Sequence, residues 1–470
     1  MKPRIGLITL VDPRQEFYER ALRLGLDIKA LNEEMHEKVR ETLTKESIDI
    51  VEDQFISNKN DAEQIVKGIL KRNIELLILH VPGWTFPVFG VVAAREANKH
   101  DVPSLVLATS AISGPTALKG ALDEVGLINK VLYGDITEPE VIKQICVFAR
   151  VASTKMRLSG QTLGIFGGRS MGMYTAIGDP SQIQKMFGVD IEHIDQIEIV
   201  REAEKVSPEL VNVYMEWLKR NVKEIRYDGD ILTKEKLEKQ VRCYIATKEI
   251  AKRLDISFIG IKCQPELSDG YINQCLTAML SNDPYDADGS KEPIVCACEA
   301  DMNGALTMQI LKMLSGGKPV LFMDLIDYDK KRKIVTCMNC GGASTWYASR
   351  SIQPEANLKN IELLPNVQGK AGGACASYVC APAEVITWAR LSRINGKYVM
   401  FIIKGKLITD VKMRFPLTWP TAHVAVDVNP LQILSIYDSQ HAHIVVGDYT
   451  DHLIRFCELA GIKPILFTGD

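Results

Sequence analysis

Two carboxylates in the middle of the chain follow strand-like segments and could share one chemical task. Glu299 comes directly after the apolar run 293–298, and Asp324 comes directly after the run 319–323. The segment between them, 301–314, has helical spacing. A strand–helix–strand crossover would place both carboxylates at the carboxyl ends of parallel, adjacent strands, which is where ligands bind in such sheets. We therefore expect Glu299 and Asp324 to be the catalytic pair.

Histidines near the end of the chain could complete a metal site with this pair. Two carboxylates that converge on one point repel each other unless a cation joins them. Oxygen ligands suit Mn²⁺ or Mg²⁺, and one imidazole favours manganese. His441 and His443 open a strand-like segment, where alternation places both rings on the same face. For each residue alone, a helix cap or a structural hydrogen bond is the simpler interpretation.

Two other motifs carry weaker signals. The glycine-rich turn 167–172 follows a strand-like segment but lacks the G-x-G-x-x-G spacing of a dinucleotide site, so a tight strand–helix junction is the simpler explanation. The pair Cys337 and Cys340 has C-x-x-C spacing, with Cys296 and Cys298 nearby in sequence. These pairs are scattered over apolar segments, which favours buried inert thiols over a zinc or redox site.

The elements that must position these residues change character along the chain. Strand-like and helical segments alternate up to about residue 158, and the alternation restarts at 159. This pattern predicts parallel sheets covered by helices. From about residue 336, short strand-like runs separated by Gly, Pro and Asn turns predict a mostly antiparallel β domain. We expect domains at 1–158, 159–335 and 336–470.

Composition narrows the class of protein. The 470 residues predict about three domains at roughly 100–200 residues each. Hydrophobic residues make up 46% and charged residues 24%, which excludes a disordered or fibrous chain. The formal net charge of −3 offers no basic field, so we expect neither nucleic acid nor a membrane surface as a partner.

Membrane and export signals are also weak. The longest uncharged run, 76–94, is interrupted by prolines and glycines, which favours a strand, a loop and a helix start over a membrane span. The opening residues 1–12 are typical of a first strand, without the cleavage site of a secretory signal. Eleven cysteines in such a chain favour reduced thiols and a cytoplasmic location.

A set of short motifs, in order along nearly the whole chain, resembles the L-fucose isomerase family, a relative of the L-arabinose isomerases. The motifs are Val81-Pro-Gly-Trp84, Ser170-Met-Gly172, Gln264-Pro-Glu-Leu-Ser-Asp269, Asn282-Asp-Pro-Tyr-Asp286, Lys291-Glu-Pro293, Glu299-Ala-Asp-Met-Asn-Gly304, Phe322-Met-Asp324, Thr418-Trp-Pro420 and His441-Ala-His-Ile444. Each fragment alone is weak evidence, but their shared order is specific.

The resemblance implies a fold, an assembly and a metal site. The fold would be two doubly wound, Rossmann-like α/β domains followed by a β-barrel-like C-terminal domain. The chain would form a homo-oligomer, a hexamer or a trimer, in which the first domain closes a neighbouring subunit's active site. Glu299, Asp324 and His443 would bind Mn²⁺, for which Mg²⁺ or Co²⁺ could substitute. The two carboxylates would also transfer protons.

The resemblance further implies a sugar substrate. The residues expected to contact the sugar are Gln264, Trp419, Trp84 from a neighbouring subunit, Arg14, Met171 and Cys340. Cys340 stands where the family pattern Asn-Ser-Gly has its serine, so the preferred sugar is open. We expect an aldose–ketose isomerase that acts on L-fucose or D-arabinose through an enediol. The alternatives are the same chemistry on another aldose such as L-arabinose, or a sugar-binding protein without catalysis.

Overall fold

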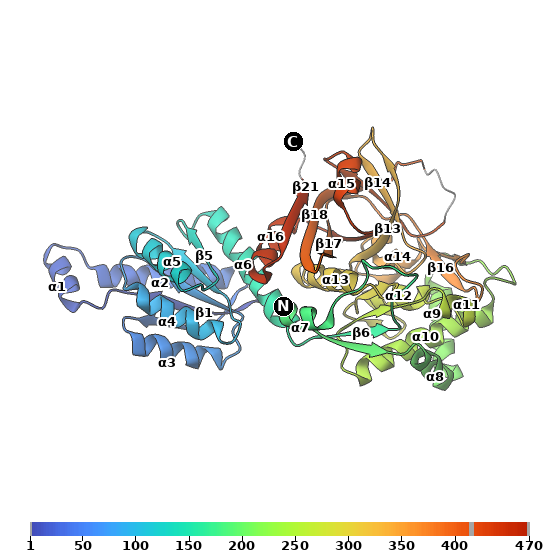
Figure 1. Cartoon of the computed structure of the whole chain (residues 1–470), viewed down its shortest axis with the longest axis horizontal. Helices are drawn as coiled ribbons and strands as arrows, with labels where there is room; N and C mark the ends of the chain where they lie inside the picture. Colours follow the sequence, from blue (N-terminus) through green and yellow to red (C-terminus); the bar gives the residue numbers. More distant parts are fainter. Residues whose placement is uncertain (1, 413–417, 468–470) are drawn as a thin grey trace. The chain divides into compact units, whose positions relative to one another are not determined.

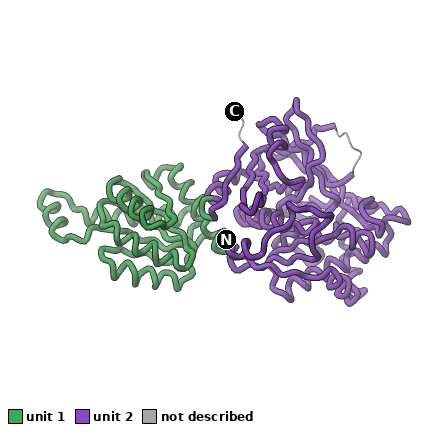
Figure 2. Tube along the Cα trace, viewed as in Figure 1, with its two compact units in different colours: residues 1–157, 458–460 green, residues 158–457, 461–470 purple. Residues whose placement is uncertain are grey.

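The computed structural model describes residues 2–412 and 418–467 and separates into two compact units (Figure 2). The first unit contains residues 1–157 and 458–460, and the second contains 158–457 and 461–470. The predicted division into three domains stays a prediction. Over the described residues, the helices are all too short or too polar to cross a membrane.

The first unit is built on a five-stranded parallel sheet in the order β2-β1-β3-β4-β5 (Figure 1). Its strands are β1 (Arg4–Leu10), β2 (Asp49–Ile56), β3 (Leu76–His80), β4 (Ser104–Ala108) and β5 (Asn129–Tyr133). Its helices are α1 (Gln15–Arg23), α2 (Ile28–Lys45), α3 (Lys59–Leu70), α4 (Pro87–Asn98), α5 (Ser113–Glu124) and α6 (Pro139–Leu158). The strands β3 and β4 are buried along their whole length, which explains their continuous apolar sequences.

The second unit begins with a four-stranded parallel sheet in the order β12-β9-β6-β7. Its strands are β6 (Thr162–Phe166), β7 (Asp190–Ile194), β9 (Phe258–Ile261) and β12 (Cys296–Cys298). The helices in this part of the chain are α7 (Pro180–Phe187), α8 (Ile197–Lys205), α9 (Pro208–Asn221), α10 (Lys234–Arg253), α11 (Glu266–Gly270), α12 (Cys275–Asn282) and α13 (Met302–Leu314). The predicted alternation of strands and helices around parallel sheets is confirmed.

The same unit contains a larger mixed sheet in the order β17-β20-β13-β14-β19-β18-β21. Its strands are β13 (Leu321–Asp329), β14 (Ile334–Met338), β17 (Ala383–Ile394), β18 (Lys397–Ile408), β19 (Thr421–Val426), β20 (His441–Val446) and β21 (Lys463–Phe467). All its pairings are antiparallel except that of β18 with β21. Since β17 pairs with both β20 and β18, the hydrogen-bonded order returns on itself. The barrel-like form of this domain stays a prediction.

One sequence expectation about the two carboxylates is wrong. The strand before Glu299 and the strand that contains Asp324 do not pair with each other: β12 pairs with β9 in the parallel sheet, whereas β13 pairs with β14 and β20 in the mixed sheet. The helix α13 therefore leads from one sheet to the other and does not cross over within a single sheet. A short apolar strand has the same sequence pattern in either kind of sheet, which is why the pattern misled.

The remaining short elements connect these layers. They are β8 (Glu224–Ile225), β10 (Tyr285–Asp286), β11 (Gly289–Ser290), η1 (Thr345–Ala348), α14 (Pro354–Leu358), β15 (Glu362–Pro365), β16 (Ala374–Ser377), α15 (Pro430–Ile436) and α16 (Thr450–Ala460). The strands β8, β15 and β16 form a small three-stranded sheet.

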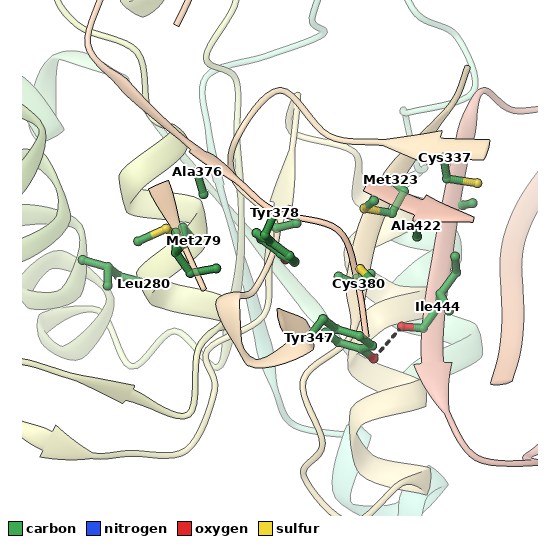
Figure 3. Packing of buried hydrophobic residues seen from close by; sticks show 14 of the residues in the cluster. Met279, Leu280, Met323, Cys337, Tyr347, Ala376, Tyr378, Cys380, Ala422 and Ile444 are labelled. Atoms are coloured by element: carbon green, nitrogen blue, oxygen red, sulfur yellow. Dashed lines mark hydrogen bonds between the residues drawn. The ribbon is translucent and has the colours of Figure 1, made fainter. Parts of the chain in front are cut away.

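A hydrophobic core joins helix α12 to the mixed sheet (Figure 3). Met279 from α12 belongs to the same buried cluster as Met323 from β13 and Ile444 from β20. Tyr347 is fully buried among them, and its hydroxyl lies within hydrogen-bonding distance of the backbone oxygens of Ile444 (3.0 Å) and Pro319 (2.9 Å). This packing fixes the backbones of β13 and β20, the two strands that carry Asp324 and His441.

Candidate active site

Three side chains that can hold a metal ion converge in the second unit. They are Glu299, directly after β12, Asp324 on β13 and His441 at the start of β20. One ligand atom from each lies within 4.8 Å of the others. The Nε2 atom of His441 is 2.9 Å from Glu299 Oε2 and 3.5 Å from Asp324 Oδ1. The predicted carboxylate pair therefore meets, although its two strands belong to different sheets.

Strand register and a strained turn bring these groups together. Asp324 lies directly opposite His441 in the antiparallel β13–β20 pair, so their side chains are cross-strand neighbours. Glu299 and Ala300 both adopt left-handed backbone conformations, with φ of 60° and 54°. Such conformations cost about 1–3 kcal/mol each in non-glycine residues and persist where the surroundings impose them. They turn the chain between β12 and α13 and direct Glu299 toward His441.

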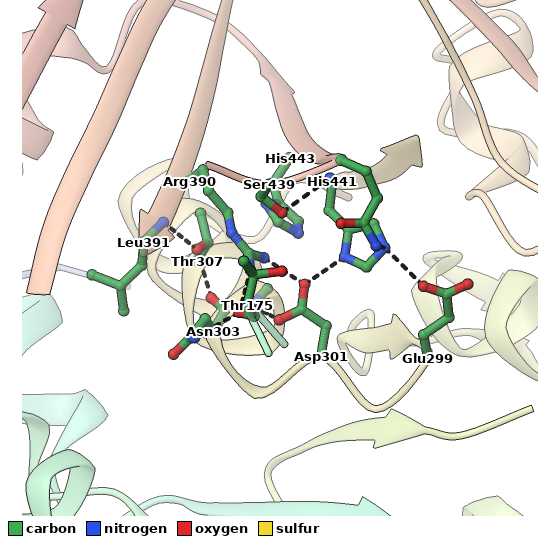
Figure 4. Close-up of polar contacts among 12 residues, drawn as sticks. Thr175, Glu299, Asp301, Asn303, Thr307, Arg390, Leu391, Ser439, His441 and His443 are labelled. Atoms are coloured by element: carbon green, nitrogen blue, oxygen red, sulfur yellow. Dashed lines mark hydrogen bonds and ion pairs between the residues drawn. The ribbon is translucent and has the colours of Figure 1, made fainter. Parts of the chain in front are cut away.

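A buried carboxylate behind His441 orients the imidazole (Figure 4). Asp301 Oδ2 accepts a hydrogen bond from His441 Nδ1 at 2.6 Å and also bonds the guanidinium of Arg390. The other oxygen, Oδ1, accepts from the backbone N–H of Gly304 at 2.8 Å and caps helix α13. Because Nδ1 is occupied, Nε2 is the atom that faces Glu299 and Asp324, as in metal sites where a carboxylate holds the ligating histidine.

Charge in this cluster is set by its partners. Burial opposes ionisation of Asp301, but Arg390 and His441 outweigh it and hold the pKa of this carboxyl well below its usual range. Burial likewise opposes the charge on His441, yet hydrogen bonds to Asp301 and Glu299 raise its pKa to about 9. Burial raises the pKa of Asp324 to about 7; Glu299 adds to this shift and His441 opposes it. The raised pKa values favour protons on His441 and Asp324, and a divalent cation bound between these groups would displace those protons.

The other candidate histidine, His443, lies two residues further along β20. His443 pairs with Phe322 on β13 and Ala389 on β17, and its Nδ1 is 3.3 Å from the backbone oxygen of Ala389. Phe322 contacts both rings, with centroids 4.4 Å and 5.2 Å away, so both histidines occupy one face as predicted. His443 does not belong to the group of possible metal ligands. The structure thus brings His441 to the carboxylates in place of the predicted His443.

The other predicted residues of the second unit are placed by backbone contacts. The Ser170 hydroxyl donates to the backbone oxygen of Gln264 at 3.0 Å, which ties the turn before Met171 to this motif. Met171 is 53% exposed and has a φ of 44°. Trp419 is partly buried, and its backbone oxygen accepts from Thr421 Oγ1 at 2.8 Å. The roles of these side chains toward a sugar stay predictions.

Cys340 lies near enough to Asp324 to contribute to the raised pKa of that carboxyl. Hydrogen bonds from Cys275 and Cys298 hold its pKa well below the usual range, and the charge of His441 contributes to this shift. Arg14 and Trp84 belong to the first unit. There Arg14 forms an ion pair with Asp12 at 2.6 Å, and Trp84 is 43% exposed. Their assignment to a neighbouring subunit's sugar site stays a prediction.

The sequence analysis missed Asp301 and Arg390. Both side chains are fully buried, and they meet across 88 intervening residues. A weak signal for Arg390 existed, because it is a single cation inside the apolar strand run 386–391. Asp301 precedes a helix and could be recognised as its N-cap, but its contact with His441 depends on the tertiary fold.

Fold and site together define a mixed α/β protein with a candidate divalent-metal centre. Comparison with known families adds two matches. Residues 2–160 match the model of the L-fucose isomerase first N-terminal domain, and residues 337–467 match that of the L-fucose isomerase C-terminal domain. The chain belongs to the L-fucose isomerase family, a family of aldose–ketose isomerases.

Similar curated proteins carry two different names. The chain is 24% identical over 285 residues to a sulfoquinovose isomerase of Alkalicoccus urumqiensis, covering 60% of this chain and 59% of that protein. It is 23% identical over 343 residues to a sulfoquinovose isomerase of Priestia aryabhattai, covering 72% of this chain and 71% of that protein. It is 22% identical over 371 residues to an L-fucose isomerase of Streptococcus pneumoniae (strain CGSP14), covering 69% of this chain and 61% of that protein.

Proposed function

We propose that this chain catalyses a metal-dependent aldose–ketose isomerisation through an enediol. The observation that carries the proposal is the convergence of Glu299, Asp324 and His441, whose ligand atoms lie within 4.8 Å of one another. Membership of the L-fucose isomerase family supports the same reaction class.

Glu299, Asp324 and His441 would hold the metal ion. Two carboxylates and one imidazole suit Mn²⁺, with Mg²⁺ or Co²⁺ as substitutes. When bound, such an ion supplies a Lewis acid that stabilises negative charge on sugar oxygens, which is worth several kcal/mol. His441 takes the place in this ligand set that the resemblance gave to His443, because its Nε2 faces both carboxylates.

Glu299 and Asp324 would also move the protons of the reaction. Isomerisation transfers one proton between C1 and C2 of the sugar and another between their oxygens. In the metal-free protein the pKa of the Asp324 carboxyl is about 7; a bound cation would lower it, so both carboxylates would be ionised and able to accept a proton from the sugar. Such positioned acid–base groups typically contribute on the order of 10²–10⁴-fold. Glu299 and Asp324, as a pair, would supply both transfers.

We propose L-fucose and D-arabinose as the first candidate substrates, with L-fuculose and D-ribulose as their products. A second candidate is sulfoquinovose, because several of the matched relatives are named sulfoquinovose isomerases. L-Arabinose is a further candidate aldose. Cys340, beside the carboxylates, is a position where side-chain chemistry could select among these sugars.

The proposal is tested by incubating each of these aldoses with metal-free and Mn²⁺-loaded protein and measuring ketose formation. We expect turnover of at least one aldose that requires the metal. Glu299→Gln and Asp324→Asn should each reduce this turnover by at least roughly 10²-fold. Glu384→Gln is a matched control, because the Glu384 carboxylate is 94% exposed. Metal-independent binding of a sugar without turnover would favour a non-catalytic sugar-binding protein.

The expected homo-oligomer has its own test. Light scattering would distinguish a hexamer or a trimer from a monomer. If Trp84 serves a neighbouring subunit's site, mixing inactive Trp84→Ala and inactive Glu299→Gln subunits should restore part of the activity. Mixtures that stay inactive, although the subunits exchange, would contradict the shared site.

A further inference from the structure

Two cysteine sulfurs lie close together beside the carboxylate site. The Sγ atoms of Cys275, the first residue of α12, and Cys340, in the turn after β14, are 4.0 Å apart. Both are free thiols. The C-x-x-C partner in sequence, Cys337, is instead buried in the hydrophobic core as part of β14. The pair with close sulfurs in the structure is therefore Cys275 and Cys340, and not Cys337 and Cys340 of the C-x-x-C motif.

The surrounding hydrogen bonds hold these two residues together. The Asn366 side-chain N–H group donates to Cys275 Sγ at 3.2 Å and to the backbone oxygen of Cys340 at 3.0 Å. The Cys275 thiol donates to the same backbone oxygen at 3.3 Å. One amide thus bridges helix α12 and the turn. A disulfide has an S–S distance of about 2.0 Å, so the two sulfurs, 4.0 Å apart, need to approach by about 2 Å.

The two residues differ in their exposure to solvent. Cys275 is 5% exposed, whereas Cys340 is partly exposed. A small oxidant would therefore reach Cys340 first, and Cys275 is placed to attack the oxidised sulfur. This division of roles matches that of a reactive and a resolving cysteine.

We propose that Cys340 and Cys275 form a peroxide-oxidisable dithiol. In the first step the Cys340 sulfur takes one oxygen from a hydroperoxide, forming a sulfenic acid and releasing water, or an alcohol from an organic peroxide. In the second step the Cys275 sulfur attacks the Cys340 sulfur, the S–O bond breaks, and the hydroxyl leaves as water with the Cys275 proton. The two thiols lose two electrons, and the peroxide gains them. A dithiol reductant reverses the change.

Oxidation at this place would affect the carboxylate site. Met338 lies opposite Asp324 in the β13–β14 pair, and Cys340 is two residues further along. Drawing the Cys340 sulfur toward α12 would shift the turn that borders Asp324. We therefore expect the disulfide form to bind Mn²⁺ at least about tenfold more weakly, about 1.4 kcal/mol. This consequence depends on the proposed metal site, whereas formation of the disulfide does not.

The test treats the full-length native protein with hydrogen peroxide, blocks the remaining thiols and maps peptides by mass spectrometry. We expect a cross-link between the peptides of Cys275 and Cys340, a mass lower by two hydrogen atoms, and reversal by dithiothreitol. In Cys275→Ala the cross-link should be absent, and Cys340 should gain two oxygen atoms as a sulfinic acid. Cys380→Ala, which removes a buried core thiol, is the matched control and should keep the cross-link.

Two results would overturn the proposal. One is the absence of the cross-link while other thiols are oxidised. The other is a cross-link from Cys340 to Cys298, which also hydrogen-bonds its sulfur. Measuring the Mn²⁺ affinity of the reduced and the oxidised protein tests disulfide formation and its effect on the metal site separately. A cross-link without a change in affinity contradicts only the effect on the metal site.

Discussion

The two units each bury a histidine at a strand end, and the pKa values of the two histidines shift in opposite directions. In the first unit, His80 at the end of β3 is fully buried between two hydroxyls: Nδ1 is 2.9 Å from Thr9 Oγ1 and Nε2 is 2.8 Å from Thr109 Oγ1. Burial lowers its pKa to about 3. In the second unit, His441 is equally buried between carboxylates, and its pKa rises to about 9. Partner chemistry, and not burial, decides the charge.

The comparison also shows that the carboxyl edge of a parallel sheet does not by itself bring metal-binding groups together. Thr9, His80 and Thr109 lie at the carboxyl edge of a parallel sheet, where α/β proteins usually bind ligands. Their polar atoms hydrogen-bond one another, and among the described residues they belong to no group of possible metal ligands. The candidate metal site instead lies between two sheets of the second unit, where Glu299 and Asp324 converge. The predictions below test this contrast, beginning with the largest expected effect.

The first prediction concerns a variant in which His441, like His80, has a neutral partner in place of the Asp301 carboxylate. Asp301→Asn removes the negative charge that pairs with both His441 and the fully buried Arg390. Leaving a buried cation without its partner costs about 3–5 kcal/mol. We therefore expect the free energy of unfolding, measured in urea, to be lower by that amount in the variant. NMR titration should also show a lower pKa for His441.

The control for this variant is Glu384→Gln, which neutralises an exposed carboxylate. An Asp301→Asn protein within about 1 kcal/mol of the unmodified chain would contradict the role of Asp301, since surface changes usually fall within that range.

The second prediction concerns pH in the metal-free protein. The pKa of His441 is raised to about 9, so its contribution to stability is complete below its unfolded pKa of about 6.5 and is lost as pH rises through 9. The pKa of Asp324 is raised to about 7, so stability also falls as pH rises through 7. At about 1.4 kcal/mol per unit of pKa shift, we expect the free energy of unfolding to fall by roughly 3 kcal/mol between pH 6.5 and 9.

Metal binding should show the opposite dependence. Mn²⁺ would displace protons from His441 and Asp324, so its affinity should rise by about tenfold or more from pH 7 to pH 8. Calorimetry in buffers of different ionisation enthalpy would count the released protons. An affinity that does not change over this range would argue against His441 as a ligand.

The sequence predicted much of this arrangement and missed its register. Glu299 and Asp324 were expected to meet because both follow apolar strands, and they do meet. Alternation places His441 and His443 on one face and does not separate them, and the resemblance pointed to His443. Only the pairing of β20 with β13 sets His441 opposite Asp324. The strand pattern is local information, whereas the partner strand is not.

The contact between Asp301 and Arg390 could not be predicted for the same reason, because it depends on which strands and helices meet in the fold. The contact of Asp301 with Arg390 joins the start of α13 to β17, and neither segment's periodicity reveals it. The strands of the parallel sheets follow the sequence pattern more closely: β4, Ser104–Ala108, has the sequence SLVLA and is buried along its whole length. Buried parallel strands have continuous apolar sequences, which a linear pattern can identify.

The third prediction tests how closely α13 approaches the histidines. A Cβ atom on Gly304 would lie 2.7 Å from Asp301 Oδ2 and 2.8 Å from His443 Nε2. Ala favours a helix over Gly by about 1 kcal/mol, so propensity alone predicts that Gly304→Ala stabilises the protein. Asp301 is held by Arg390 and His441 and has little freedom to move, so we expect a net destabilisation of about 1–3 kcal/mol.

Urea unfolding of Gly304→Ala would decide the sign. Gly120→Ala in helix α5 is the matched control, because a Cβ there meets no atom within 4 Å. This variant should be as stable as the unmodified chain or more stable. Destabilisation of both variants to the same degree would show that the crowding at Gly304 is not the cause.

The smallest effect is expected in the hydroxyl-bonded cluster of the first unit. Thr9 Oγ1 is 2.8 Å from His36 Nδ1 and 2.9 Å from His80 Nδ1, so it can donate to one ring and accept from the other. Thr9→Val keeps the shape but leaves both ring atoms without this partner, at a cost of about 1–2 kcal/mol, whereas Thr9→Ser should retain most of the stability. Mn²⁺ affinity should be the same in both variants, because the proposed ligands all belong to the second unit. Equal unfolding free energies for the Val and Ser variants would show that His80 does not need the hydroxyl. The contrast would then rest on the carboxylates around His441 alone.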